Sequence, residues 1–290
     1  MTLSLKTYPA CSEPVGGTLH VVATPIGNLS DITERAIEVL RSVDLIACED
    51  TRTSRSLLRS RQITTQVMSL HKFSETRRTQ TILGLLERGE NVALIADAGT
   101  PALSDPGTIL VRAALDAGYR VTPIPGASAI TAALSVSGMD TSSFVYLGFA
   151  PRKDEQRRRF FNEIILEERT CVFLESPKRL PDTLRVAAEI LGDTHMVVMR
   201  ELTKLYEEML HGPPAVILGA LETRESVKGE IIVVVEACGN VTDEVDLDGL
   251  VRTLMQEGYS GKKLADEARR RYGVRKADAY GRFLELKEPS

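Results

Sequence analysis

The sequence predicts an α/β protein in which two α/β domains precede a small helical module. Residues 18–138 alternate short apolar runs with segments of helical spacing, a pattern typical of a parallel sheet with right-handed crossovers. Residues 139–240 continue the alternation and add residues 206–211, a strand expected to run antiparallel to its neighbour. The second sheet is therefore expected to be mixed. Residues 241–290 show helical spacing after an acidic linker, and a length of 290 residues fits about two domains.

Each element of the first domain has a local signal. Apolar runs predict its strands, which cover residues 19–24, 43–48, 91–96 and 119–124. Apolar residues at helical spacing predict its helices, which cover residues 31–42, 74–88 and 107–117. Gly118 is the expected C-cap of the third helix, and Asp105 is expected to cap its start together with Pro106 and Gly107. Residues 1–17 are interpreted as a flexible leader.

The second domain and the module follow the same rules. The predicted strands are residues 144–149, 170–175, 196–201 and 230–236. The predicted helices are residues 153–168, 177–191 and 213–224, followed in the module by 248–257, 260–271 and 275–287. Ser176 is expected to be the N-cap of the second of these helices, because Pro177 would then occupy its first turn. Four acidic residues make residues 241–249 a solvated linker.

The composition narrows the class of protein. A net charge of −4 argues against a globally basic nucleic-acid binder, although residues 260–288 carry nine Lys/Arg against five Asp/Glu. The four cysteines form no C-x-x-C pair and the four histidines show no H-E-x-x-H spacing, so no metal site is expected. No apolar run approaches the roughly 20 residues that cross a bilayer, and no secretory signal is visible. We therefore expect a cytoplasmic protein with reduced cysteines.

Four loops of the first domain follow predicted strands and should meet at one edge of the sheet, where open α/β sheets bind ligands. These loops begin at Pro25, Glu49, Asp97 and Pro125. They lack the lysine and the glycine density of a phosphate-binding loop. Small residues and backbone groups suit a neutral nucleoside better, and an adenosine that carries a compact amino-acid group is one plausible ligand.

Seven blocks, in order, resemble the ribosomal RNA small subunit methyltransferase I family. The blocks are V-A-T-P-I-G-N-L-S-D-I-T-E-R-A (22–36), D-L-I-A-C-E-D-T-R (44–52), D-A-G-T-P-A-L-S-D-P-G (97–107), P-I-P-G-A-S-A (123–129), F-L-E-S-P-K-R-L (173–180), R-E-L-T-K (200–204) and K-G-E-I-I-V-V-V-E (228–236). The resemblance implies a tetrapyrrole-methylase-like fold and S-adenosylmethionine as the methyl donor. It also implies 2′-O-methylation of a cytidine in the decoding region of 16S ribosomal RNA. A homodimer, with the cofactor in a cleft between the two α/β domains, is part of the same implication.

The resemblance also assigns cofactor residues. From the first domain it implies Asp97, Gly99, Thr100, Pro101, Ser128 and Ala129. From the second domain it implies Phe173, Leu174, Glu175 and Gly229, with Glu230 beside them. The motif here is D-A-G-T-P, whereas the tetrapyrrole enzymes carry G-D-P, so the location carries over better than the individual contacts.

Methyl transfer to a hydroxyl needs positioning and a proton acceptor. Glu49, Asp50 and Glu201 are the candidate catalytic residues, because each is predicted at a strand end. Arg52 and Lys204 are candidates to hold RNA phosphate or to orient these acids. The alternative is that Glu49, Asp50 and Arg52 form a structural network of ion pairs and a helix cap.

Two basic stretches are candidates for RNA contact. Residues 151–159 open a helix in which acids are interspersed, so they are either an RNA contact or a solvated face; Lys178 and Arg179 are further candidates. In the module a small apolar core would leave cations outside, and a helix-turn-helix layout would grip phosphate. The cations assigned to RNA are Lys262, Lys263, Arg269, Arg270, Arg275 and Lys276, with Arg271 beside them.

Two other functions are compatible with the same fold. One is a methyltransferase acting on a small tetrapyrrole-like substrate, for which a basic tail has no use. The other is a non-catalytic ribosome-binding protein, which would differ in not binding the cofactor.

Overall fold

The computed structural model describes residues 16–71, 74–224, 226–238, 247–272, 274 and 276–287. The chain forms two compact units, Met1–Ala132 with Leu202–Leu205, and Ala133–Glu201 with Tyr206–Ser290. The first division lies close to the domain boundary predicted at residue 138. No helix in the described ranges is long and apolar enough to cross a membrane.

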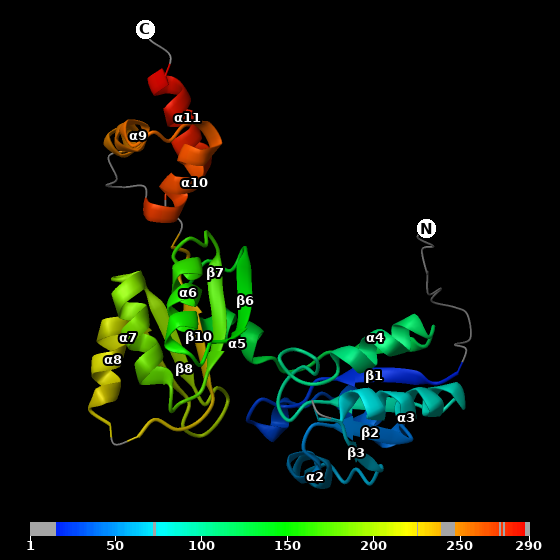
Figure 1. The fold of residues 1–290 in the computed structure, drawn as a ribbon. Helices are drawn as coiled ribbons and strands as arrows, with labels where there is room; N and C mark the ends of the chain where they lie inside the picture. The colour runs from blue at the N-terminus through cyan, green and yellow to red at the C-terminus, as the bar shows by residue number, and fades with distance from the viewer. Residues whose placement is uncertain are drawn as a thin grey trace, which may run out of the picture. The chain divides into compact units, whose positions relative to one another are not determined.

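The first unit contains a five-stranded parallel sheet, as predicted (Figure 1). Its strands are β1 (Thr18–Val22), β2 (Leu45–Cys48), β3 (Val67–Ser69), β4 (Val92–Ile95) and β5 (Arg120–Ile124), in the order β3-β2-β4-β1-β5. The sequence analysis missed β3, a three-residue edge strand whose side chains are only half-buried. Because all the strands are parallel, the loops that follow them emerge at one edge.

Helices cover both faces of this sheet. They are α1 (Glu34–Ser42), α2 (Thr51–Ser60), α3 (Glu75–Glu87) and α4 (Thr108–Asp116), with a short 3₁₀ turn η1 (Leu29–Asp31) before them. Helix α5 (Ala129–Val136) follows β5 and contains the division between the two units. Apolar side chains of α1 and α2 pack on one face, and those of α3 and α4 pack on the other. Helix α2 was not predicted, because only Leu57 and Leu58 supply buried apolar side chains in it.

The start of α4 differs from the sequence prediction. Its N-cap is Gly107, whose φ of 133° few other residues tolerate. The buried carboxylate of Glu75, on α3, accepts hydrogen bonds from the backbone N–H of Gly107 (2.9 Å) and of Ile109 (3.0 Å). A side chain from another helix therefore caps α4, and the assignment of this role to Asp105 was wrong.

The second unit contains a mixed five-stranded sheet, again as predicted. Its strands are β6 (Phe144–Phe149), β7 (Thr170–Glu175), β8 (Met196–Arg200), β9 (Glu208–Gly212) and β10 (Ile231–Val235), in the order β6-β7-β10-β8-β9. The antiparallel strand expected at residues 206–211 is β9, which pairs with β8. Helices α6 (Asp154–Ile164), α7 (Leu180–Leu191) and α8 (Pro214–Glu222) share one apolar core with the sheet.

Helix α7 begins later than the sequence predicted. Ser176 is not its N-cap, because the first helical residue is Leu180 and Arg179 occupies the cap position. The Ser176 carbonyl instead accepts hydrogen bonds from the N–H groups of Arg179 and Leu180, which closes a separate turn after β7.

The C-terminal module has a core of its own. Helices α9 (Leu247–Gln256), α10 (Gly261–Tyr272) and α11 (Lys276–Lys287) bury residues such as Leu254, Leu264 and Phe283 against one another. The predicted leader, except residues 16 and 17, and most of the predicted linker at 241–249 lie outside the described residues.

Candidate active site

The loops after β1 and β4 are bound to each other at the carboxyl edge of the first sheet. The backbone groups of Thr24 and Gly99 exchange two hydrogen bonds, of 2.9 and 3.1 Å. The buried Thr24 hydroxyl also donates to the carbonyl of Ala96 at 3.1 Å. This bridge fixes the D-A-G-T-P segment beside the end of β1, so the predicted convergence of these two loops is confirmed.

Two glycines allow the loops to come this close. Gly99 has a φ of 76°, and a Cβ atom added there would lie 3.2 Å from the side chain of Ile26. A Cβ atom added at Gly126 would lie 3.1 Å from that of Ala23, so the loop after β5 also packs on the end of β1. Ser128 and Ala129 follow at the start of α5 and are half-buried. Any larger residue at Gly99 or Gly126 would push these loops apart.

Three carboxylates from three loops influence one another at this edge. Burial raises the pKa of Asp105 to about 6, and the negative charges of Glu49 and Asp97 add to the effect. Desolvation also raises the pKa of Glu49, helped by the charges of Asp97 and Asp50. Desolvation raises the pKa of Asp97 too. The ionised forms of these carboxylates are thus disfavoured by lost hydration and by one another, so this edge disfavours a phosphate group and favours a cation.

Sequence reasoning missed Asp105 as a site residue. It was interpreted as a helix cap because it stands before a Pro-Gly pair, and caps are the common role of such aspartates. The long loop between β4 and α4 brings it back toward the strand ends, and only the tertiary structure reveals this.

Asp50 and Arg52 have a structural role in the described chain. Asp50 is the N-cap of α2, and its Oδ1 accepts a hydrogen bond from the Arg52 N–H at 2.8 Å. The Arg52 guanidinium pairs with the same carboxylate at 2.9 Å and thereby lowers the pKa of Asp50. The Asp50 N–H in turn donates to Asp97 at 3.1 Å. The cap-and-ion-pair alternative therefore describes Asp50 and Arg52, while Glu49 stands apart from that ion pair.

In the second unit, the side chains of Phe173 and Glu175 point into internal contacts. Phe173 is 1% exposed and its ring packs edge-to-face on Phe160 and Phe161. The buried Glu175 carboxylate accepts from the Thr183 hydroxyl and the Ser176 N–H, both at 2.6 Å, and pairs with Arg179 at 2.5 Å. A cofactor contact at these two positions would therefore come from the backbone. Leu174, between them, is half-buried.

Glu201 and Gly229 form a tight backbone pair in the second unit. Glu201 has an unusual φ of 54°, and its carboxylate accepts a hydrogen bond from the Glu230 N–H at 2.9 Å. A Cβ atom added at Gly229 would lie 2.5 Å or less from atoms of this carboxylate, so only glycine fits there. Backbone strain of this kind concentrates at functional sites. The structure thus brings two of the predicted site residues together.

The segment Leu202–Leu205 packs with the first unit. The Thr203 hydroxyl accepts a hydrogen bond from the Asn28 N–H at 3.2 Å. The side chain of Lys204 lies against Gly27, where an added Cβ atom would approach it to 2.4 Å. Lys204 therefore belongs with the loop after β1.

The predicted RNA-binding cations of the module are described only in part. Lys262 and Lys263 are exposed at the start of α10. Arg271 is committed to Glu257 and Glu267 in ion pairs within the module. Arg275 lies outside the described residues, and the same holds for the side chains of Arg269, Arg270 and Lys276.

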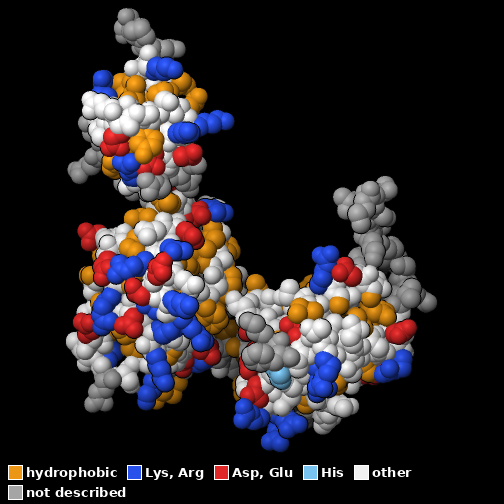
Figure 2. Space-filling view, viewed as in Figure 1, with side chains coloured by type: hydrophobic (Ala, Val, Ile, Leu, Met, Phe, Trp, Pro, Cys, Tyr) orange, Lys and Arg blue, Asp and Glu red, His pale blue; other side chains and the backbone are white. Residues whose placement is uncertain are grey.

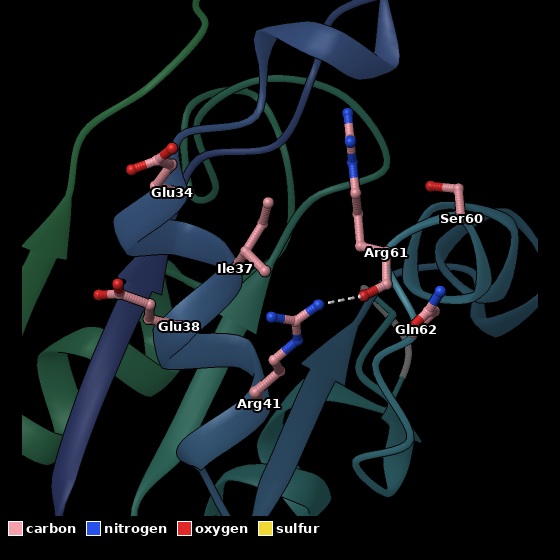
Figure 3. A pocket seen from close by; sticks show the side chains of 7 residues that line it. All are labelled: Glu34, Ile37, Glu38, Arg41, Ser60, Arg61 and Gln62. Atoms are coloured by element: carbon pink, nitrogen blue, oxygen red, sulfur yellow. Dashed lines mark hydrogen bonds between the residues drawn. The ribbon is translucent and has the colours of Figure 1, made fainter.

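A pocket on the flank of the first unit contains none of these residues (Figure 3). It lies between α1 and the end of α2, where the Arg41 guanidinium donates to the Arg61 carbonyl at 2.7 Å. The residues that line it are Glu34, Ile37, Glu38, Arg41, Ser60, Arg61 and Gln62. Glu34, Glu38 and Arg41 are exposed, the Arg61 guanidinium donates to the Leu29 carbonyl, and we assign no ligand to this pocket.

Comparison with known proteins places the chain in a family. The sequence profile described as Tetrapyrrole (Corrin/Porphyrin) Methylases matches residues 18–217. This chain belongs to the tetrapyrrole methylase family. Within that family it is 43% identical over 275 residues to the ribosomal RNA small subunit methyltransferase I of Escherichia coli O157:H7, covering 93% of this chain and 95% of that one. The protein of the same name from Mesorhizobium japonicum is 41% identical over 281 residues, covering 96% and 95%.

Solved structures of tetrapyrrole methylases and related enzymes share the fold. A cobalt precorrin-4 methyltransferase aligns with a TM-score of 0.55 at 17% identity, covering 76% of this chain and 94% of that one. A diphthine synthase aligns with a TM-score of 0.58 at 15% identity, covering 76% and 90%. At such identities the likeness concerns the fold alone. The predicted family, the α/β fold with a parallel and a mixed sheet, and the assignment as a methyltransferase are confirmed.

Proposed function

We propose that this tetrapyrrole methylase homologue transfers a methyl group from S-adenosylmethionine to the ribose 2′-hydroxyl of a cytidine in the decoding region of 16S ribosomal RNA. The observation that carries the proposal is the 43% identity to a small subunit methyltransferase I over 93% of the chain. Such coverage extends past residue 217, where the methylase profile ends, into the C-terminal module. A tetrapyrrole-like substrate accounts for the fold but not for this near full-length match.

The cofactor fits the acidic edge of the first unit. S-adenosylmethionine supplies an electrophilic methyl group on a sulfonium, which is a cation. Desolvation, helped by mutual repulsion, raises the pKa values of Glu49, Asp97 and Asp105, and a bound cation would stabilise their ionised forms. Gly99, Thr100 and Pro101 would hold the methionine part with Asp97, and Ser128 and Ala129 would continue that surface. The second unit would contribute the Gly229 turn, the Leu174 side chain, and the backbone of Phe173 and Glu175.

Among the three candidate acids, Glu49 is the best proton acceptor for the 2′-hydroxyl. Its raised pKa makes it a stronger base than an ordinary glutamate, and Asp50 is committed to α2 and Arg52. The Glu201 carboxylate is held by the Glu230 N–H, which suits a role in shaping the Gly229 turn. Positioning of the substrate would supply most of the remaining rate.

RNA binding would involve Arg52 and Lys204 near the first sheet and the cations of the module. The module residues in this proposal are Lys262, Lys263, Arg269, Arg270, Arg275 and Lys276. Lysine and arginine contacts of this kind fix the position of a substrate on its phosphates and carry no base specificity.

We include a homodimer and a cytoplasmic location in the proposal. Strand β6 is an edge of the second sheet, and its Phe144 and Phe149 are 41% and 56% exposed. Exposed apolar side chains on an edge strand support a protein interface there. Sedimentation of the purified protein measures the oligomeric state, and a small ribosomal subunit as substrate would keep the enzyme in the cytoplasm.

Mass spectrometry of 16S rRNA from cells with and without this protein tests the reaction. We expect one methylated cytidine to lose its mark in the deletion strain and to regain it when purified small subunits are incubated with the enzyme and S-adenosylmethionine. Unchanged rRNA, together with methylation of an added tetrapyrrole, would favour the alternative substrate. Calorimetric titration with S-adenosylmethionine tests cofactor binding separately.

A further inference from the structure

The cations of the second unit fall into two groups. Eight arginines within residues 133–238 form ion pairs with carboxylates: Arg157, Arg158, Arg159, Arg169, Arg179, Arg185, Arg200 and Arg224. Four of them lie on α6 and α7, and positive and negative side chains are interspersed over this unit (Figure 2). In the described part of this range, four exposed cations lack such a partner: Arg152, Lys153, Lys178 and Lys228.

These four cations lie at one edge of the second sheet. Arg152 and Lys153 follow β6, and Lys178 follows β7, which runs parallel to β6. Strand β10 runs antiparallel to β7 with Ile231 opposite Glu175, so Lys228, just before β10, is at the same edge. We call Arg152, Lys153, Lys178 and Lys228 the basic edge.

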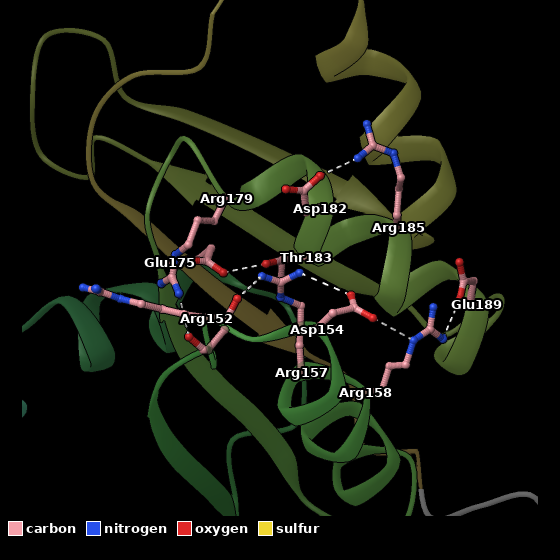
Figure 4. A network of polar contacts seen from close by, with 11 residues as sticks. Arg152, Asp154, Arg157, Arg158, Glu175, Arg179, Asp182, Thr183, Arg185 and Glu189 are labelled. Carbon is pink, nitrogen blue, oxygen red and sulfur yellow. Dashed lines mark hydrogen bonds and ion pairs between the residues drawn. The ribbon is translucent and has the colours of Figure 1, made fainter.

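Buried and partly buried arginines contact the loops that carry the basic edge. Arg157 is 5% exposed and donates to the Arg152 carbonyl at 3.1 Å, and Arg179 donates to the Ala150 carbonyl at 3.1 Å (Figure 4). Arg200 donates to the Lys228 carbonyl at 3.2 Å. The backbone of the loop after β6 and that of the loop before β10 are therefore each held by arginine side chains. In the loop after β7, Arg179 donates to the Ser176 hydroxyl at 3.0 Å. The exposed cations of all three loops stay available.

The neighbouring acids do not neutralise the basic edge. Asp154 and Glu155 come directly after Lys153, but they pair with Arg158 and Arg159 one turn further along α6. The stretch 151–159 thus divides into a solvated, internally paired part and an unpaired part. The interpretation as a solvated face describes the paired part, and the unpaired part is the one open to an RNA contact.

We propose that the basic edge binds the phosphate backbone of the RNA substrate. Neighbouring strands lie about 4.8 Å apart, so the loops beside β6, β7 and β10 spread their charges over about 10 Å. That span matches about three steps of ~3.4 Å along a stacked strand, and hence about four phosphates. Fixed loops lower the entropy lost when the cations meet these phosphates. The inference rests on the proposed function, because it takes small-subunit RNA as the partner.

The test is a fourfold variant, Arg152→Gln, Lys153→Gln, Lys178→Gln and Lys228→Gln, in the full-length protein. Its affinity for small ribosomal subunits is measured by filter binding between 50 and 200 mM KCl. Loss of four phosphate contacts should make the slope of log K against log[KCl] shallower by about 3. Over this range the wild-type affinity should then fall about 50-fold more than that of the variant.

A control variant removes the same number of positive charges from the first unit. Arg35→Gln, Arg59→Gln, Arg77→Gln and Arg120→Gln remove four exposed cations of the first unit that have no ion pair in the described chain. The control should keep the wild-type salt slope, and both variants should keep the wild-type Tm and S-adenosylmethionine affinity. A wild-type salt slope in the basic-edge variant, or an equally reduced slope in the control, would overturn the inference. The proposed function would still hold if the wild-type enzyme methylates the subunit. A wild-type enzyme that neither binds nor methylates the subunit would overturn both.

Discussion

At the scale of single residues, four carboxylates near the first sheet edge differ through their surroundings alone. Asp50 is held ionised by Arg52, whereas desolvation and mutual repulsion favour the neutral forms of Glu49, Asp97 and Asp105. Perturbed pKa values of this kind gather at functional sites. The sequence places Glu49, Asp50 and Asp97 at strand ends, but it does not show which carboxylate accepts a hydrogen bond and which is desolvated.

Asp105 should make the protein less stable as the pH rises. Its pKa is about 6 in the folded chain, against 3.8 for an unperturbed aspartate, so the folded state binds the proton more tightly. Its stabilising contribution is complete below pH ~4 and is lost as the pH rises through about 6. Asp105→Asn should therefore raise Tm by about 2–4 °C at pH 8 and by much less at pH 4.

Asp140→Asn provides the opposite control. Hydrogen bonds from Ser142 lower the pKa of Asp140, so the ionised carboxylate stabilises the fold and Asp140→Asn should reduce Tm at pH 8. Differential scanning calorimetry from pH 4 to 8 measures both variants, and a pH-independent effect of Asp105→Asn would contradict the assignment.

Glu49→Gln should slow methyl transfer without destabilising the fold. Removing a general base typically costs about 10²–10⁴-fold in rate. Asp50→Ala should instead lower the stability of the fold, because α2 loses its N-cap. Single-turnover rates and urea titrations separate the two effects. A normal rate of methyl transfer in Glu49→Gln would show that this edge of the first sheet contributes to catalysis by positioning the reactants rather than by accepting a proton at Glu49.

At the scale of elements, the sequence predicts strands well where burial is continuous. Strand β4 and strand β10 are buried at every position, and their uninterrupted apolar runs reveal them. Helix α2 was not predicted because its stability depends on the Asp50 cap and on Leu57 and Leu58 rather than on a broad apolar face. The caps of α4 and α7 depend on contacts that local patterns do not contain, such as Glu75 reaching from α3.

The same limit applies to the candidate site. The convergence of four loops follows from parallel strands and was predictable. The internal use of Glu175 was not, because its partner Thr183 lies on the next helix. Such pairings depend on where two elements pack.

Glu208, on β9, should support the loop before β10. It bridges Arg224 and Arg200, and these guanidinium groups lower its pKa to about 2. The resulting stability is present above the ordinary glutamate pKa of 4.5 and is lost as the pH falls toward 2. Glu208→Gln should cost about 2 kcal/mol at pH 7 and, by releasing Arg200 from its partner, should loosen the Lys228 loop.

Urea unfolding at pH 7 and pH 3 measures the first effect of Glu208→Gln, and subunit binding at 50 mM KCl measures the second. The variant should approach the wild type in stability at pH 3. An equal loss at both pH values would show that packing, rather than charge, is what Glu208 contributes.

At the scale of the whole molecule, a net charge of −4 conceals a separation of charge. The first sheet edge gathers carboxylates, whereas the second unit leaves unpaired cations at its basic edge. One surface thus suits a cationic cofactor and the other a polyanionic substrate. The net charge taken from the composition argues against a nucleic-acid partner. The distribution of the charges over the surface is what makes such a partner compatible with the chain.

Removing residues 239–290 should separate substrate binding from cofactor binding. The module buries its apolar side chains in a core of its own, so its loss should leave the α/β cores intact. Lys262 and Lys263 would be removed with it, and affinity for the small subunit should fall at least about tenfold, consistent with the loss of several phosphate contacts.

Full-length protein with Lys262→Gln and Lys263→Gln is the matched control, and it should lose part of the affinity and make the salt slope shallower by about 1.5. Calorimetry should give S-adenosylmethionine the same affinity in all three proteins. Unchanged subunit affinity in the truncated chain would show that the α/β units alone bind the RNA. The whole electrostatic contribution to binding would then come from the basic edge and its neighbours.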